Sequence, residues 1–321
     1  MNNNFFLIET IKKIHFDIVK AITTQVVSGT VEQTVADENV SHGDVSYAID
    51  IEAESIILNQ INKICDYYTV RLIMEGMGEK IISPGKSEII TIIIDPIDGT
   101  REIMYDKRSA WILTGISFAK DPVINDIEIA IQTEIPISKQ NHFSHLFACR
   151  GNGAFEEIYD KDTFQLVKSK TLLSSSKSDG FKDGYICFPN PFPGIKETIA
   201  KRYEKFYANI FPNKSINDAK VFADEYISTG GHIYLLATGR YRLVADIRDF
   251  VQIEKNSLCC HPYDLCTVLI AIEAGCKIVN LDNESINYPL DVVTNCNWIG
   301  FANLQLYNHY QALLFESIFI P

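Results

Sequence analysis

The chain has 321 residues, of which 46% are hydrophobic and 22% are charged, a composition typical of a globular protein with enough residues for two modest domains. Its formal net charge of −12 argues against a nucleic-acid partner, although bound metal ions could still attract phosphate compounds. No apolar run approaches the roughly 20 residues that span a bilayer, so no membrane partner is expected.

The first half of the chain begins with helical patterns and continues with strand-like runs. Apolar periodicity predicts helices over residues 5–23 and 51–64, with a polar segment, residues 28–50, between them. Runs rich in β-branched residues predict strands near residues 70–74, 90–94, 113–118, 127–133 and 146–149. This order predicts an α+β first half with a mainly antiparallel sheet.

The second half alternates strand-like and helical segments. Strands are expected within residues 184–188, 241–247 and 276–281. Helices are expected over residues 196–208, 230–237 and 264–274. Such alternation favours α/β layering, and a seam near Asp160 divides the chain into two expected domains, residues 1–160 and 161–321.

The N-terminal sequence and the cysteines indicate the cellular compartment of the protein. The first residues, MNNNFFLIETIKKIHFDIVK, place lysines after the apolar residues and offer no small-residue cleavage site, so we expect no signal peptide and a cytoplasmic location. The eight cysteines are scattered without a CxxC pair, which favours buried free thiols. Cys259, Cys260 and His261 are adjacent and lack the ligand spacing of a structural zinc site.

The segment ITIIIDPIDGTRE, residues 90–102, places two aspartates directly after a buried strand. Pro96 lacks the N–H that a sheet ladder needs, so the strand is expected to stop at Asp95. Gly99 permits a tight turn, and Thr100 is expected to cap the helix that follows. Two carboxylates at a strand end, before the free N–H groups of a helix start, can hold cations and an anion together.

Two other interpretations of this segment fit poorly. A calcium loop with Gly99 as its invariant glycine would need acidic residues where Pro96 and Ile94 stand. Phosphatases of the haloacid-dehalogenase type have one residue between their two aspartates, whereas two residues separate Asp95 from Asp98. That spacing changes the side to which the second carboxylate points.

The hexapeptide DPIDGT resembles the signature of the inositol monophosphatase family, whose superfamily includes fructose-1,6-bisphosphatases and phosphoadenosine phosphatases. Four further segments resemble elements of that family in the same order: GDVSYAIDIEAE with Asp44, Asp50 and Glu54, LIMEGMGEK with Glu75, FACRGNGAF, and HPYDLCTVLIAIEAGCKI with Asp264. Together the five matches run from Asp44 to Gly275 and cover most of the chain.

The resemblance implies a layered αβαβα sandwich, α+β in the first half and α/β in the second, with the site between the halves. It implies Mg²⁺-dependent hydrolysis of a small phosphate monoester, an inositol phosphate or a sugar phosphate, by a metal-activated water. Two or three Mg²⁺ ions are expected, and lithium is expected to inhibit. The implied metal ligands are Glu75, Asp95, the backbone carbonyl of Ile97, Asp98 and Asp264.

The resemblance assigns the other site residues to three roles. Thr100, held by Asp50, would orient the attacking water and accept its proton. The N–H groups of Gly99 and Thr100 would meet the phosphate. The substrate-side residues would be Tyr263, in place of the family's tryptophan, and Gly230 and Gly231.

Several alternatives stay open at this point. Glu79 competes with Glu75 for the same metal. Ser257 stands where inositol-specific members carry a glutamate, although Glu254 is near, so a nucleotide 3′-phosphate is a further candidate substrate. Residues 192–224 and the C-terminus are extra relative to a typical inositol phosphatase.

Two questions concern the class of the protein and its assembly. A non-catalytic relative acting as an interaction platform would usually have lost a metal carboxylate, and here the set is complete. Family members are often homodimers, so a homodimer is a possible assembly.

Overall fold

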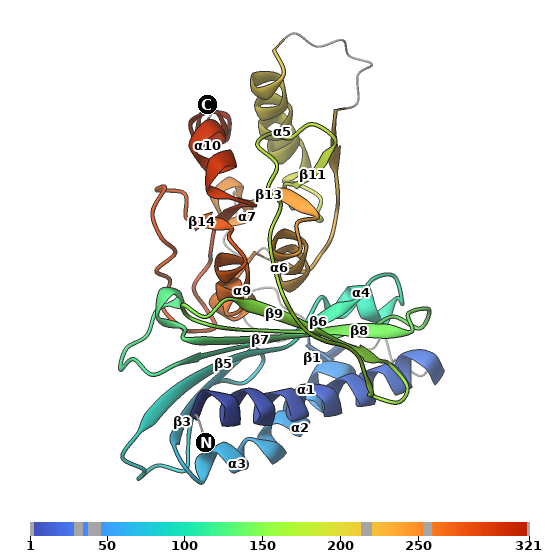
Figure 1. Cartoon of the computed structure of the whole chain (residues 1–321), viewed down its shortest axis with the longest axis vertical. Helices are drawn as coiled ribbons and strands as arrows, with labels where there is room; N and C mark the ends of the chain where they lie inside the picture. The colour runs from blue at the N-terminus through green and yellow to red at the C-terminus, as the bar shows by residue number, and fades with distance from the viewer. Residues whose placement is uncertain (1–2, 29–34, 38–45, 213–219, 253–258, 320–321) are drawn as a thin grey trace.

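The computed structural model describes residues 3–28, 35–37, 46–212, 220–252 and 259–319. Figure 1 shows alternating layers of helix and sheet, with the N-terminal helices beneath a broad sheet and the second half of the chain above it. The expected αβαβα sandwich is confirmed.

The outer helical layer consists of α1 (Asn3–Ser28), α2 (Ala48–Gln60) and α3 (Asn62–Cys65). Along α1, Leu7, Ile11, Ile14, Ile18 and Ile22 are fully buried, and their spacing of three or four residues forms one apolar stripe. This stripe packs on the sheet, mainly against its central strand β7. A short ribbon of β1 (Val35–Asp37) and β2 (Ser46–Tyr47) precedes α2.

The first sheet has eight strands in the order β10-β9-β8-β7-β6-β5-β3-β4, and only β3 and β5 run parallel. Helices cover both faces, so β5, β6 and β7 are buried along almost their whole length. Its strands are β3 (Thr69–Met74), β4 (Gly78–Ile82), β5 (Ile89–Asp98), β6 (Ala110–Ser117), β7 (Ile129–Ile135), β8 (His142–Cys149), β9 (Ala154–Asp160) and β10 (Leu166–Leu172). Two short helices lie between strands, α4 (Thr100–Met104) and η1 (Ile124–Asp126).

The second sheet has five strands in the order β12-β11-β13-β15-β14, with β11 parallel to both of its neighbours and the other pairs antiparallel. Its strands are β11 (Gly184–Cys187), β12 (Val221–Ala223), β13 (Tyr241–Asp246), β14 (Lys277–Val279) and β15 (Trp298–Phe301). Between the sheets lie α6 (Thr229–Ala237), α8 (Pro262–Leu265) and α9 (Val268–Glu273). The described residues of this half form three more helices: α7 (Arg248–Val251) after β13, and α5 (Lys196–Ile210) packed against α10 (Leu304–Ile318).

The expected seam at Asp160 falls inside the first sheet. Strand β10 pairs with β9, so the chain leaves this sheet only after Leu172. Polar contacts then join the halves. Gln132 of β7 donates to the carbonyl of Gly230 at 2.7 Å and accepts from the Thr267 hydroxyl at 2.9 Å. A buried amide that bonds both α6 and the α8–α9 region fixes the second half on the first.

Two of the family-like segments contact each other through a carboxylate and a glycine turn. The carboxylate of Glu273, in the IEAG segment, accepts hydrogen bonds from the N–H of Gly151 at 2.7 Å and of Gly153 at 2.8 Å, both in the RGNG turn. Both glycines have positive φ, 73° and 82°, a region that disfavours side chains. These two segments therefore support the fold.

The end of strand β5 differs from its prediction. The strand passes through Pro96 to Asp98, because Asp95 pairs with Leu113 and Asp98 with Trp111, leaving one extra residue on β5. This bulge accommodates the proline, which lacks an N–H, without ending the strand.

Other boundaries were also wrong or missed. The helix expected over residues 264–274 is two helices, α8 and α9, and that expected over 51–64 begins at Ala48. No strand or helix was expected for β4, β9, β10, β12, β15 or α10.

The cysteine prediction is confirmed. All eight cysteines are free, and all but the partly buried Cys149 are buried. None of the helices in the described ranges combines the length and apolar character of a membrane span.

Candidate active site

A cavity of about 360 Å³ lies between the two halves of the chain. Its first wall consists of the end of β5, the start of α4, residues of α2 and the turn after β3. Its second wall consists of the segment after β11 and the starts of α6, α7 and α8. All the predicted site residues except Gly230 and Gly231 line this cavity.

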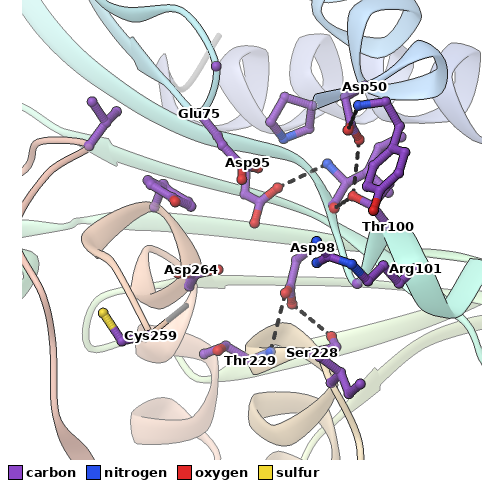
Figure 2. Close-up of a pocket in the computed structure, with 18 of the residues that line it drawn as sticks. Asp50, Glu75, Asp95, Asp98, Thr100, Arg101, Ser228, Thr229, Cys259 and Asp264 are labelled. Atoms are coloured by element: carbon purple, nitrogen blue, oxygen red, sulfur yellow. Dashed lines mark hydrogen bonds between the residues drawn. The ribbon is translucent and has the colours of Figure 1, made fainter. Parts of the chain in front are cut away.

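Three predicted metal ligands converge at one end of the cavity. Asp95 and Asp98 come from the bulged end of β5, and Asp264 comes from α8. One carboxylate oxygen from each lies within 4.8 Å of the others, and no other such acidic, histidine or cysteine group occurs in the described part of the chain. Figure 2 shows Glu75 beside Asp95, so a fourth carboxylate joins this acidic cluster.

The cluster is electrostatically costly without a cation. Burial, and then the charges of Glu75, Asp98 and Asp264, raise the pKa of Asp95 well above its ordinary value. Burial also raises the pKa of Asp98 to about 6, although hydrogen bonds act to lower it. Carboxylate oxygens are the donors that hard divalent cations prefer, and a cation among them would remove the repulsion. The residues present therefore fit the expected Mg²⁺.

The start of helix α6 holds Asp98 in place. The Asp98 carboxylate accepts hydrogen bonds from the Ser228 hydroxyl at 2.7 Å, the Gly230 N–H at 2.5 Å and the Thr229 N–H at 3.3 Å, two of which Figure 2 draws. These donors stabilise the charged form and fix its orientation. The hydrogen bonds from Ser228 and Thr229 to Asp98 were not predicted from the sequence, because nothing local shows that α6 begins opposite β5.

The geometry does not support substrate contact by Gly230 and Gly231. Both are buried, and their N–H groups already bond Asp98 and the Ser228 hydroxyl. A Cβ on Gly230 would stand 2.6 Å from a methyl carbon of Leu113, and one on Gly231 would overlap the Tyr226 ring. The glycines are needed for close packing beneath the site.

Thr100 and Asp50 meet as expected. Thr100 Oγ1 lies 3.0 Å from Asp50 Oδ1 and 2.8 Å from the carbonyl oxygen of Ile97, and it can donate its single proton to either. Asp50 is held in turn by the N–H of Tyr47 at 2.9 Å. Thr100 is the first residue of α4 and not its cap, because Gly99 takes the N-cap position with a φ of 91°.

The structure separates Glu75 from its rival Glu79. Glu79 lies on the exposed strand β4, forms two hydrogen bonds of 2.9 Å with Arg71, and does not line the cavity. Glu54, one turn after Asp50 on α2, does line it. Burial, and then the Asp50 charge, raise the pKa of Glu54 to about 7. Glu54 was matched to the family pattern without being assigned a role.

The second wall carries Tyr263 and Asp264. The Tyr263 ring lines the cavity and stacks on His261 with 5.2 Å between ring centroids, and its hydroxyl lies 3.1 Å from His261 Nδ1. The N–H of His261 donates to Asp264 at 2.6 Å and orients its carboxylate. Three residues of the sequence argument, Asp44, Glu254 and Ser257, lie outside the described residues.

Comparison with known proteins identifies the family of this chain. A profile of the inositol monophosphatase family matches residues 7–313. The chain belongs to the inositol monophosphatase family. The search of curated proteins gave no match.

Solved structures of inositol monophosphatase-like proteins share the fold over almost the whole chain. Fructose-1,6-bisphosphatase from Leishmania major is 14% identical with a TM-score of 0.70, covering 98% of this chain and 94% of its own. The suhB protein of Bartonella henselae is 17% identical with a TM-score of 0.66, covering 96% and 98%. A Pyrococcus horikoshii protein described as similar to inositol-1 monophosphatase is 19% identical with a TM-score of 0.64, covering 97% and 99%.

The family is one of phosphatases, which supports hydrolysis of phosphate monoesters by this chain. The family also generally uses divalent metal ions, which agrees with the acidic cluster.

Proposed function

We propose that the chain is a Mg²⁺-dependent phosphatase that hydrolyses a small phosphate monoester, an inositol phosphate or a sugar phosphate. The observation that carries the proposal is the convergence, in one cavity, of the acidic cluster with the hydrogen-bonded pair Thr100 and Asp50. The acidic cluster can hold metal ions, and the pair Thr100 and Asp50 can accept and transfer a proton.

Two or three Mg²⁺ ions would be held by oxygen atoms of five residues: Glu75, Asp95, Ile97 through its backbone carbonyl, Asp98 and Asp264. When bound, such ions make a coordinated water more acidic and stabilise the negative charge of the transition state. Ser228 and the first N–H groups of α6 keep Asp98 oriented for this role, and His261 does so for Asp264.

Thr100 and Asp50 would carry out the proton chemistry. With its proton donated to Asp50, the Thr100 oxygen is left with lone pairs that can accept a hydrogen bond from the attacking water. The Asp50 carboxylate, fixed by the Tyr47 N–H, can then take up the proton through Thr100. The N–H groups of Gly99 and Thr100, at the start of α4, would bind the phosphate oxygens.

The alcohol half of the substrate would lie against the second wall of the cavity, where the buried Tyr263 ring supplies an apolar surface. Lithium inhibition, a cytoplasmic location and a homodimer stay predictions from the sequence. A nucleotide 3′-phosphate is the alternative substrate, and a non-catalytic platform is disfavoured because the ligand set is complete.

A phosphate-release screen tests the proposal. The purified chain is incubated with a panel of inositol, sugar and nucleotide monophosphates, with Mg²⁺ and with excess chelator. We expect release from at least one ester with Mg²⁺ and none with chelator. Full turnover in excess chelator, or no release from any ester, would contradict the proposal.

A further inference from the structure

The wall that faces the alcohol half of a substrate is formed at the carboxyl ends of two parallel strands. Pro189, Pro191 and Phe192 follow β11, and Arg248 follows β13. This wall therefore contributes both apolar side chains and one cationic side chain to the cavity. Among the described lining residues, Arg248 is the one lysine or arginine that the second half contributes.

Arg248 is held by Asp246 through one edge of its guanidinium group. Nε donates to Oδ1 at 2.9 Å and Nη2 donates to Oδ2 at 2.7 Å. The Asp246 side chain is fully buried and that of Arg248 is 10% exposed. Two parallel hydrogen bonds to a buried carboxylate fix the plane of the guanidinium as well as its position.

The opposite edge of the guanidinium has donors to spare. A guanidinium carries five N–H bonds, and Asp246 takes one from Nε and one from Nη2. The remaining bonds, two on Nη1 and one on Nη2, have no acceptor among the described residues. Arg248 lines the cavity, and its Nη1, which has no acceptor in the described part of the chain, keeps some solvent exposure, so this edge is open to a ligand in the cavity. An edge with parallel N–H bonds matches the two oxygens of a carboxylate or a phosphate.

We infer that Arg248, oriented by Asp246, binds an anionic group on the alcohol half of the substrate. The substrate class is therefore a phosphate monoester that carries a second acidic group, a carboxylate or another phosphate. This inference rests on the proposed function, in which the acidic cluster and its metal ions take the phosphate that is removed. Pro191 and Phe192 line the same cavity and make it less polar, and a charge-assisted contact is stronger where the local dielectric is low.

A purely structural ion pair is the competing explanation. Arg71 on β3 and Glu79 on the exposed strand β4 show what such a pair looks like, because the same nitrogens, Nε and Nη2, each donate at 2.9 Å to a carboxylate, and neither residue lines the cavity. That pair supports the sheet edge and needs no ligand. Arg248 differs in presenting its free edge to a cavity that also contains the acidic cluster.

Binding of non-hydrolysable phosphonates separates these explanations. The dissociation constants of benzylphosphonate are compared with those of its 3- and 4-carboxy and 3- and 4-phosphonomethyl derivatives by calorimetry, with Mg²⁺ present. The carboxy derivatives test a carboxylate as the second acidic group, and the phosphonomethyl derivatives test a second phosphate. We expect the wild type to bind at least one acidic derivative about tenfold tighter than benzylphosphonate, as a charge-assisted contact provides.

The variant Arg248→Gln is expected to lose this preference, bringing the ratio of dissociation constants to about one. Arg248→Gln leaves the buried carboxylate of Asp246 without its partner, which could unfold the chain. The double variant Asp246→Leu with Arg248→Met removes both charges and should give the same ratio of dissociation constants. Arg71→Gln is the matched control and should keep the wild-type ratio.

Three results would overturn the inference: no preference in the wild type for any derivative, a preference that survives Arg248→Gln, or one that depends on Arg101, the other arginine of the cavity, in its place. The binding assay does not depend on turnover. Failure of the proposed function would show instead as absence of phosphate release from every ester, whatever the binding ratios are.

Discussion

Two buried polar regions of this chain differ in charge: a layer of histidines and threonines is neutral, whereas the acidic cluster gathers like charges. Under α1, His15 lies 2.9 Å from the Thr133 hydroxyl and 2.8 Å from that of Thr114, and Thr133 lies 2.8 Å from His145. Burial lowers the pKa of His15 to about 3 and that of His145 well below its ordinary value, so both are neutral. In the acidic cluster the carboxylates repel one another, and the pKa of Asp95 is raised.

The two regions differ as a stabilising polar group differs from a functional one. The histidine and threonine layer satisfies most of its polar atoms within the protein and carries no charge, as a structural network should. The acidic cluster places like charges in a buried space, an arrangement that folding alone would not favour. Its cost is offset only when something positively charged binds, so the cluster points to a ligand.

The largest expected effect comes from Asp95→Asn. It removes one charge from the centre of the acidic cluster while keeping the size of the side chain. We expect kcat for phosphate release to fall at least ~10³-fold, because the metal contribution amounts to several kcal/mol. Circular dichroism should show an intact fold. Near-normal turnover would remove Asp95 from the mechanism.

Thr100→Ala should have the next largest effect on turnover. Its hydroxyl bonds Asp50 and is assigned to the attacking water, a contact that matters mainly in the transition state. A loss of roughly 10²-fold in kcat with little change in KM is expected. The assay should use the best ester of the panel and p-nitrophenyl phosphate, and both should be impaired. An unchanged kcat would exclude this role.

The contribution of the neutral histidine and threonine layer to the free energy of unfolding should depend on pH and not on metal ions. Because the pKa of His15 is about 3 when folded and ordinarily near 6.5, the unfolded chain binds more protons below pH 6.5, and stability falls as the pH drops toward 3. Between pH 7 and pH 5 this one group should account for about 2 kcal/mol. Urea unfolding of His15→Gln should show a smaller loss over that range than the wild type. An equal loss in both proteins would refute the assignment.

Tyr263→Ala should give the smallest effect and a different kinetic signature. The ring is assigned to the alcohol half of the substrate, so its loss should raise KM by roughly tenfold while leaving kcat less affected. A larger ester should be impaired more than p-nitrophenyl phosphate. If kcat on both esters fell as much as it does for Thr100→Ala, the division between chemistry and recognition would be wrong.

The sequence predicted the acidic cluster better than its surroundings. DPIDGT placed Asp95, Asp98 and Thr100, since a buried strand that ends in carboxylates is a local pattern. The bulge at Pro96 was not predictable, because it depends on pairing with β6. The bond of Ser228 to Asp98 and the position of Arg248 in the cavity were not predicted for the same reason: each depends on a residue or cavity that the chain brings near only after folding.

The claim that a cation relieves the repulsion in the acidic cluster is tested most directly by thermal unfolding. The wild type and Asp95→Asn are each unfolded in excess chelator and in saturating Mg²⁺. We predict that Mg²⁺ stabilises the wild type, by about 2.7 kcal/mol at one hundred times its dissociation constant. In chelator, Asp95→Asn should be the more stable protein, because a buried like charge is gone, and Mg²⁺ should stabilise it much less. A wild type unaffected by Mg²⁺, or equal stabilisation of both proteins, would contradict the account.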